Sequence, residues 1–210
     1  MSEWLLPLFP LNVVLFPRTD LPLHIFEARY KQMIADCMEN KWEFGVVLAQ
    51  EQAVENTGCT ASIAEVVRKY EDGRLDIIVR GSRRFELLLL DQQMPYLRGA
   101  PQFFDDDVSP LPPGDGRRQR ALELYSRASK LLHSDEREEG KGELESSDEQ
   151  LSYQIMGRLP VDVDFKQSLL PLRSEEDRLT RVISYLEKLI PHLALVIKAR
   201  ASAGGNGIGR

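Results

Sequence analysis

The side chains best suited to catalysis are few and scattered in this sequence. His24, His133 and His192 stand alone, without the HExxH spacing or the cysteine neighbours that a zinc site uses. The pair Gly140-Lys141 lacks both the earlier glycine and the following serine or threonine of a phosphate-binding loop. No GxSxG stretch marks a nucleophilic serine. We therefore expect no catalytic residue, no metal site and no cofactor.

Composition and cysteine usage place the chain in a broad class. It is 42% hydrophobic and 29% charged, which is typical of a soluble globular protein. No apolar run approaches the roughly 20 residues of a membrane helix, and no signal peptide is visible at the N-terminus. Cys37 and Cys59 are too few for a disulfide framework. We expect a cytoplasmic protein without a membrane partner.

The charge distribution disfavours a nucleic-acid partner. Residues 1–113 contain 11 Lys and Arg against 17 Asp and Glu, a net charge of −6, whereas residues 114–210 contain 16 of each. Neutralisation of phosphates is the main attraction in most nucleic-acid complexes, and an acidic domain opposes it. Arg80, Arg83 and Arg84 do cluster, but three arginines near a turn usually form a solvated or ion-paired face.

The elements that would position any site begin with an apolar stretch interrupted by prolines. Residues 8–30 contain Pro10, Pro17 and Pro22 among many aliphatic side chains. A helix is excluded, since each proline in a helix interior costs about 3 kcal/mol. A single long strand is excluded as well, because it would lose three hydrogen bonds. The pattern predicts short buried strands joined by proline corners.

Further short strands and one helix are predicted up to about residue 107. An amphipathic helix is indicated over residues 27–40, and a buried strand over residues 43–50. The predicted buried stripe of the helix consists of Tyr30, Met33, Ile34, Cys37 and Met38. Asp72-Gly73 predicts a hairpin turn, and Gly81-Ser82 a second turn. Another strand is indicated over residues 96–104. Short strands at this spacing with one inserted helix predict an α+β fold built on a partly closed barrel.

The second half of the chain reads as helices. An apolar stripe runs through residues 117–133, and shorter helices are indicated before and after Pro160. The longest helix begins after Ser174 and has apolar residues at heptad spacing up to Ile197. Its wide stripe favours a core-facing bundle helix, with an intermolecular coiled coil as the alternative. Pro191 predicts a kink near residues 187–191.

A set of motifs lies along these elements. They are Phe9-Pro10-Leu11, Phe16-Pro17, Leu21-Pro22-Leu23, Ile25-Phe26-Glu27-Ala28-Arg29-Tyr30, "GCTASIAEVV", "GSRRFEL", "MPYLRGA" and "GRLPVDVDFKQSLLPLRSEEDRLTRVISYLEKLI". Together they resemble one family, the N-terminal (substrate-binding) domain of Lon protease, which is shared with the middle domain of cereblon. The resemblance is most specific in the proline-rich opening. It continues in later strands and in the helical half, so it covers nearly the whole chain.

The resemblance implies both a fold and a role. It implies a PUA-like β-pseudobarrel in residues 1–113, followed by a helical bundle in residues 114–210 with a long, kinked terminal helix. It also implies a non-catalytic module that binds unfolded or extended protein segments or a partner protein, with a separate ATPase or protease as a further partner. In Lon this domain precedes an ATPase and a serine–lysine protease, and neither motif follows in these 210 residues. We therefore expect no ATP hydrolysis or proteolysis by this chain. A PUA-like RNA-binding protein is the alternative.

Aromatic residues near the last strand are the candidates for peptide binding. They are Tyr96, Phe103 and Phe104. Along residues 96–104, Tyr96 and Phe104 share one face and Phe103 lies on the other. Because both faces carry aromatic rings, we expect one of the two phenylalanines near solvent. The alternative is that both cover the seam between the barrel and the bundle.

Overall fold

The computed structural model describes residues 4–51, 53–107, 115–132 and 144–204, with side chains up to residue 199. The chain forms two compact units: a β-unit of Met1–Asp107 and Val161–Arg173, and a helical unit of Val108–Pro160 and Ser174–Arg210. Residues 161–173, which we expected in the helical half, thus group with the strands. The predicted boundary after residue 113 and the isolated His133 lie outside the described residues.

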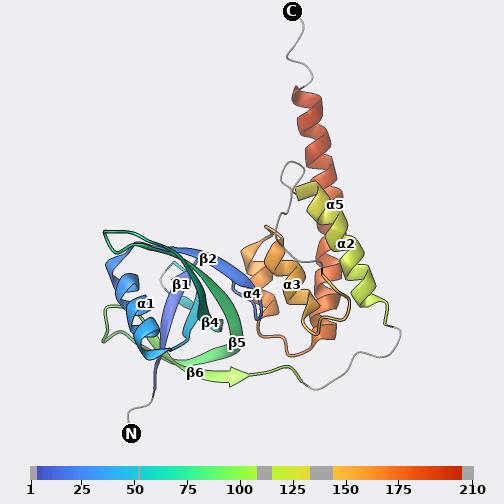
Figure 1. Cartoon of the computed structure of the whole chain (residues 1–210). Coiled ribbons are helices and arrows are strands. Elements are labelled where there is room, and N and C mark those ends of the chain that lie inside the picture. The colour runs from blue at the N-terminus through green and yellow to red at the C-terminus, as the bar shows by residue number, and fades with distance from the viewer. Residues whose placement is uncertain (1–3, 52, 108–114, 133–143, 205–210) are drawn as a thin grey trace, which may run out of the picture. The chain divides into compact units, whose positions relative to one another are not determined.

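A mixed sheet forms the β-unit (Figure 1). Its strand order is β2-β5-β4-β3-β1-β6, and β5 also pairs with β6, so the sheet curls back on itself. The β1–β3 pair is parallel, and the other pairs are antiparallel. This confirms the predicted α+β pseudobarrel followed by helices. The elements of the unit are β1 Leu6–Leu11, β2 Asp20–Ile25, α1 Ala28–Asn40, β3 Phe44–Ala49, β4 Val54–Lys69, β5 Leu75–Asp91, β6 Arg98–Phe104 and α4 Val163–Leu169.

The predicted turn at Gly81-Ser82 is wrong, because β5 runs through it as one long strand. The glycine is needed for a close backbone approach instead. A Cβ atom at Gly81 would lie 2.0 Å from the carbonyl oxygen of Phe16. The Gly81 N–H donates to the Thr19 carbonyl, and the Arg18 N–H donates to the Gly81 carbonyl. On one side of this point β5 pairs with β2, and on the other side it pairs with β6.

Two of the three early prolines lie inside strands and not at corners. Pro10 belongs to β1 and Pro22 to β2, whereas Pro17 lies in the turn between them. Strand β2 pairs only with β5, so Pro22 sits on an edge strand. At Pro10, β1 pairs only with β3, because its pairing with β6 is confined to Leu6 and Pro7. A missing N–H is tolerated at both positions because only one side of the strand is paired.

Two apolar clusters form the core of the β-unit. Strand β1 contributes to both, with Leu6 and Leu8 on one face and Phe9 on the other. The larger cluster includes the predicted inner face of α1, formed by Tyr30, Met33, Ile34 and Cys37. Complete burial of such side chains is worth roughly 1.5–3 kcal/mol each. The helix is therefore held firmly against the sheet.

The helical unit contains α2 Arg117–Leu132, α3 Leu151–Arg158 and α5 Glu175–Gly204. Helix α5 begins where expected, since the hydroxyl of Ser174 accepts a hydrogen bond from the Asp177 N–H. It continues through Pro191, and the kink there stays a prediction. Arg178 of α5 is fully buried; it forms an ion pair with Glu175 of the same helix and donates a hydrogen bond to the hydroxyl of Ser152 in α3. In the described part of the chain, no helix combines the length and apolarity that crossing a membrane requires.

Candidate protein-binding groove

The three aromatic residues predicted for peptide binding do not form one open surface. Tyr96 is 3% exposed, and its hydroxyl donates a hydrogen bond of 2.7 Å to Asp36 in α1. Phe104 is 7% exposed, and the guanidinium groups of Arg84 and Arg173 lie over its ring. Phe103 is half-buried under Arg83. Peptide binding by these residues stays a prediction, and two of them offer little surface to a ligand.

Arg84 explains why Phe104 is covered. Its buried guanidinium donates to the carbonyl oxygens of Leu170 (3.0 Å) and Leu172 (2.5 Å) and to the Asp106 carboxylate (2.5 Å). These bonds tie β5 to the segment that follows α4. Charge-assisted hydrogen bonds in a buried site are strong and specific. The segment therefore lies across the end of β6 and closes this part of the β-unit.

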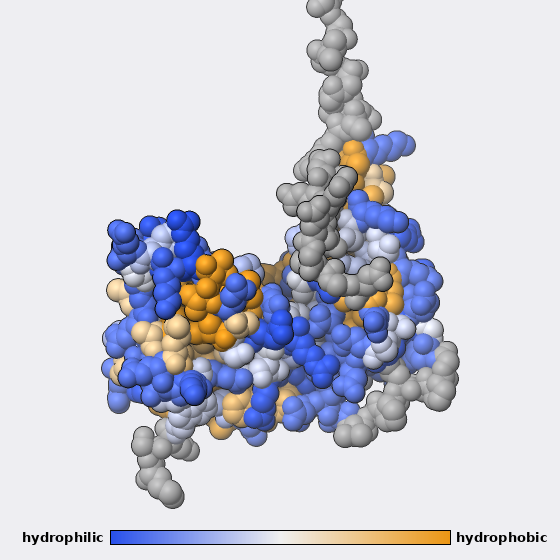
Figure 2. Space-filling model, in the orientation of Figure 1, coloured by the Kyte–Doolittle hydropathy of each residue, from blue (hydrophilic) through white to orange (hydrophobic). Residues whose placement is uncertain are grey.

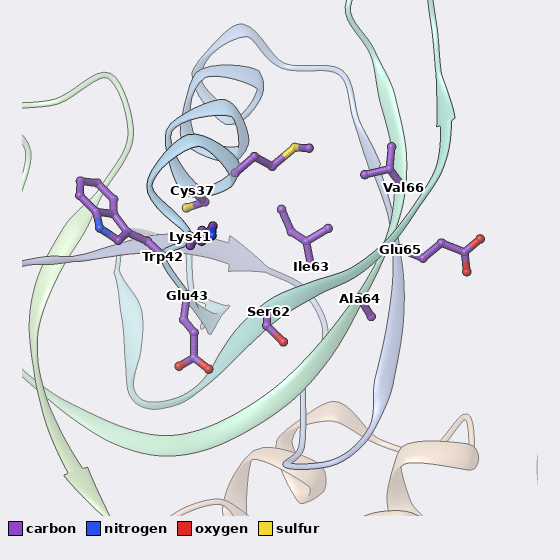
Figure 3. A pocket seen from close by; sticks show the side chains of 10 residues that line it. Cys37, Lys41, Trp42, Glu43, Ser62, Ile63, Ala64, Glu65 and Val66 are labelled. Atoms are coloured by element: carbon purple, nitrogen blue, oxygen red, sulfur yellow. The ribbon is translucent and has the colours of Figure 1, made fainter.

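A more open hollow lies between the end of α1 and β4 (Figure 3). We call it the α1–β4 groove; its volume is about 430 Å³. In Figure 3, Ile63 and Val66 of β4 point toward α1, while Ser62 and Ala64 point away from it. The groove is lined by Cys37, Met38, Lys41, Trp42, Glu43, Ser62, Ile63, Ala64, Glu65 and Val66. Its floor is apolar, and its charged groups lie at the margins.

The end of α1 fixes Trp42 at the mouth of this groove. Lys41 adopts the left-handed conformation with φ of 55°, and both its N–H and that of Trp42 donate to the Cys37 carbonyl. This is a Schellman motif, which ends a helix and sets the direction of the next residues. A non-glycine residue in this conformation costs about 1 kcal/mol. Strand β3 begins at Phe44, so the backbone of Trp42 is held between the helix end and the strand.

One edge of β4 is open beside the groove. Strand β3 pairs with β4 only from Val54 to Ala61, so residues 62–69 have no strand partner on that side among the described residues. Pairing with β5 continues on the other side, with register shifts between Ile63 and Glu65 and between Val66 and Arg68. Each shift adds one unpaired residue to β4. Such bulges twist an edge and discourage regular pairing with another strand.

Trp42 also lines a second hollow, so the two adjoin. This hollow is lined by Trp4, Leu89 and Leu90 among other residues, and its volume is about 490 Å³. The side chains of all three are 45–49% exposed, and those of Met38 and Trp42 are 40% and 41% exposed. Figure 2 shows that apolar surface is exposed on the β-unit among hydrophilic side chains. Exposed apolar surfaces rimmed by polar residues mark interaction sites in many proteins.

Sequence reasoning missed this surface. The helical stripe assigned Met38 to the buried face of α1, yet it is among the most exposed apolar side chains of that helix. The sequence does not indicate that Trp42 is exposed, because a single tryptophan can be buried or exposed. The only available signal was its position directly after a helix end.

The Cys37 thiol at the groove is not prepared to act as a nucleophile. Burial raises the pKa of the Cys37 thiol to about 12, so it is protonated at neutral pH.

A separate cluster of polar side chains lies elsewhere on the β-unit. The Nδ1 atom of His24 lies 2.5 Å from the Asp76 carboxylate, which also accepts a hydrogen bond from the Tyr70 hydroxyl. These bonds lower the pKa of Asp76 and link β2 to the β4–β5 hairpin. Among the described residues, no group of three or more His, Cys, Asp or Glu is arranged to hold a metal ion.

Comparisons with known proteins agree with this architecture. The chain is 28% identical over 202 residues to Lon protease 2 of Herpetosiphon aurantiacus, a match that covers 90% of this chain and 24% of that protein. It is 35% identical over 109 residues to the Lon protease of Parabacteroides distasonis, covering 48% of this chain and 13% of that protein. The chain therefore spans about a quarter or less of the curated relatives it matches.

Solved structures show the same fold. The Lon N-terminal domain protein from Xanthomonas campestris aligns with a TM-score of 0.66 and 24% identity, covering 87% of this chain and 98% of that one. The N-terminal domain of the Mycobacterium avium complex Lon protease aligns with a TM-score of 0.65 and 15% identity, covering 88% and 98%. The model of the ATP-dependent protease La (LON) substrate-binding domain matches residues 5–188. The chain belongs to the family of Lon substrate-binding domains.

Proposed function

We propose that this chain is a non-catalytic module that binds extended, apolar protein segments in the α1–β4 groove. One observation carries the proposal: Met38 and Trp42 are exposed beside an apolar floor formed by Ile63 and Val66. Apolar side chains held at a rigid hollow are the usual anchors of protein recognition. Membership of a substrate-binding family supports the same role.

The size of the groove sets the expected strength of binding. A volume of about 430 Å³ accepts a few apolar side chains of a ligand and not a folded domain. Because the groove offers few anchors and the extended segment loses conformational freedom on binding, we expect a weak complex, with a Kd on the order of micromolar or weaker. Weak binding suits a module that must release many different sequences. Cooperation with a separate ATPase or protease stays a prediction.

The test uses the whole chain and a labelled, permanently unfolded reporter protein. Binding is followed by fluorescence anisotropy for the wild type and for Trp42→Ala. Val67→Ala is the matched control, because Val67 is 55% exposed on the same strand as the groove floor but does not line the groove. We expect Trp42→Ala to weaken binding about tenfold or more, and Val67→Ala to leave it nearly unchanged. Equal binding by all three proteins would exclude the groove.

The same titration, repeated with RNA in place of the reporter protein, tests the alternative function, which is RNA binding. Apolar contacts change little between low and moderate salt, whereas binding to phosphates weakens steeply. The β-unit also uses its clustered arginines internally, since Arg80 pairs with Asp20 and Arg84 with Asp106. We therefore expect no salt-sensitive RNA binding.

A further inference from the structure

Three charged side chains at the α1–β4 groove are left without a partner in the described structure. The charged side chains of Lys41, Glu43 and Glu65 line the groove, and no side-chain hydrogen bond or ion pair joins any of them to another described residue. Several other carboxylates of the β-unit are paired. Paired carboxylates include Asp20 with Arg80, Asp72 with Arg74, Asp76 with His24, Asp91 with Arg98 and Asp106 with Arg84. Two unpaired carboxylates against one unpaired ammonium leave the groove margin acidic.

The two carboxylates lie at different ends of the apolar floor. In Figure 3, Glu43 points away from α1 on the side of Trp42, and Glu65 points outward beyond Val66. Ile63 and Val66 lie between them and point toward the helix. A ligand that places apolar side chains on this floor therefore carries its flanking residues past an acidic group at either end. The excess of acidic residues in the β-unit as a whole adds to the same field.

The bulges of β4 decide how such a ligand is recognised. Because the open edge of residues 62–69 is interrupted twice, it offers no long run of regularly spaced backbone groups. Recognition then rests on side chains, that is, on apolar anchors in the groove and on charges at its ends. A basic side chain beside either glutamate gains an ion pair, whereas an acidic one is repelled.

From this arrangement we infer that the groove selects extended segments in which a short apolar core is flanked by Lys or Arg, and rejects those with acidic flanks. The inference rests on the proposed function and names its preferred substrate class. Exposed ion pairs are weak, so the selection is modest. We expect basic flanks to bind about threefold to tenfold more tightly than acidic ones at low salt, with most of the difference lost at high salt.

Three synthetic peptides test the inference on the whole chain. They share the core Phe-Ile-Val-Leu and carry two Lys, two Ser or two Glu at each end. Each labelled peptide is titrated at about 20 mM and about 300 mM salt, where the Debye length differs several-fold. The same series is measured with the double variant Glu43→Gln, Glu65→Gln. Glu71→Gln is the matched control, since Glu71 is exposed, lies in the β4–β5 turn and does not line the groove.

The expected result is the order Lys, Ser, Glu from tightest to weakest. In the double variant the three affinities should fall within about twofold of one another, while Glu71→Gln keeps the order. Equal binding of the three peptides by the wild type would overturn the charge selection and leave the proposed function standing. Retention of the full order by the double variant would overturn the charge selection in the same way. If no peptide binds, including the serine-flanked one, the proposed function itself fails.

Discussion

Ile63 and Val66 point to the same side of β4, toward α1, although they are three positions apart in an extended strand (Figure 3). In a regular strand such residues face opposite sides. Here Ile63 pairs with Val79 and Val66 with Ile77, so the two occupy positions only two apart in the register of β5. Ala64 is the extra residue of the bulge. The bulge thereby turns two apolar side chains into one groove floor.

The close approach of the Phe16 carbonyl to Gly81 predicts a severe effect of one added methyl group. Gly81→Ala places Cβ against the Phe16 carbonyl, which cannot move without breaking the bonds of that turn. We expect a loss of about 3–5 kcal/mol in the free energy of unfolding, or failure to fold. Gly116→Ala is the control, since a Cβ there meets nothing within 4 Å. Urea unfolding compares them, and similar stabilities would refute the close approach.

Short-range patterns in the sequence predict local structure well in this protein, but they predict contacts between distant residues poorly. Asp72-Gly73 indicates its hairpin because Gly73 adopts a φ of +79°, which glycine tolerates best. The stripe of α1 is likewise visible as a period. The groove is not, because the bulge at Ala64 depends on the pairing with β5 and breaks the period of two. The role of Arg84 is equally invisible, since its partner Leu170 lies 86 positions away.

The long-range hydrogen bonds of Arg84 predict that two neighbouring arginines differ in their contribution to stability. Arg84→Ala removes a buried guanidinium that donates three hydrogen bonds, and it leaves the Asp106 carboxylate without this ion pair. We expect Arg84→Ala to lower the free energy of unfolding by about 3–5 kcal/mol. Arg83→Ala should cost less than about 1 kcal/mol, because its exposed guanidinium only covers the Phe103 ring. Thermal melts of the two variants test this, and equal losses would show that the anchor is unimportant.

Both thiols should be silent in the native protein. Burial raises the pKa of Cys37 and of Cys59 to about 12, so thiolate is scarce and the sulfur atoms are inaccessible. We expect almost no reaction with a chromogenic disulfide reagent at pH 8, and reaction of two thiols per chain in denaturant. Rapid native reaction of one thiol would mean that the end of α1 opens, since Cys37 lines the groove.

The Asp20–Arg80 pair predicts a small, signed dependence of stability on pH. Arg80 donates two hydrogen bonds to the carboxylate, which lowers the pKa of Asp20 below 3.8. A lowered pKa in the folded state adds stability above about pH 4, and this stability is lost as the pH falls through the folded pKa. The pair is half exposed, so the gain is less than about 1 kcal/mol. Asp20→Asn should therefore lower Tm at pH 6 and have almost no effect near pH 2. An equal loss at both values would assign the effect to packing and not to charge.

The buried stripe of α5 predicts which leucines hold the helical unit together. Leu186 is fully buried, as are Leu179 and Val182 on the same stripe. Leu186→Ala removes buried apolar atoms, with their favourable transfer free energy, and leaves a cavity. We therefore expect the free energy of unfolding to fall by about 2–5 kcal/mol. Leu195 lies on the same helix but is 67% exposed, and Leu195→Ala should change stability by less than about 0.5 kcal/mol. Calorimetry of both variants measures the contrast. If Leu186→Ala melts like the wild type, the stripe does not pack within the chain, and the intermolecular coiled coil becomes the better account of α5.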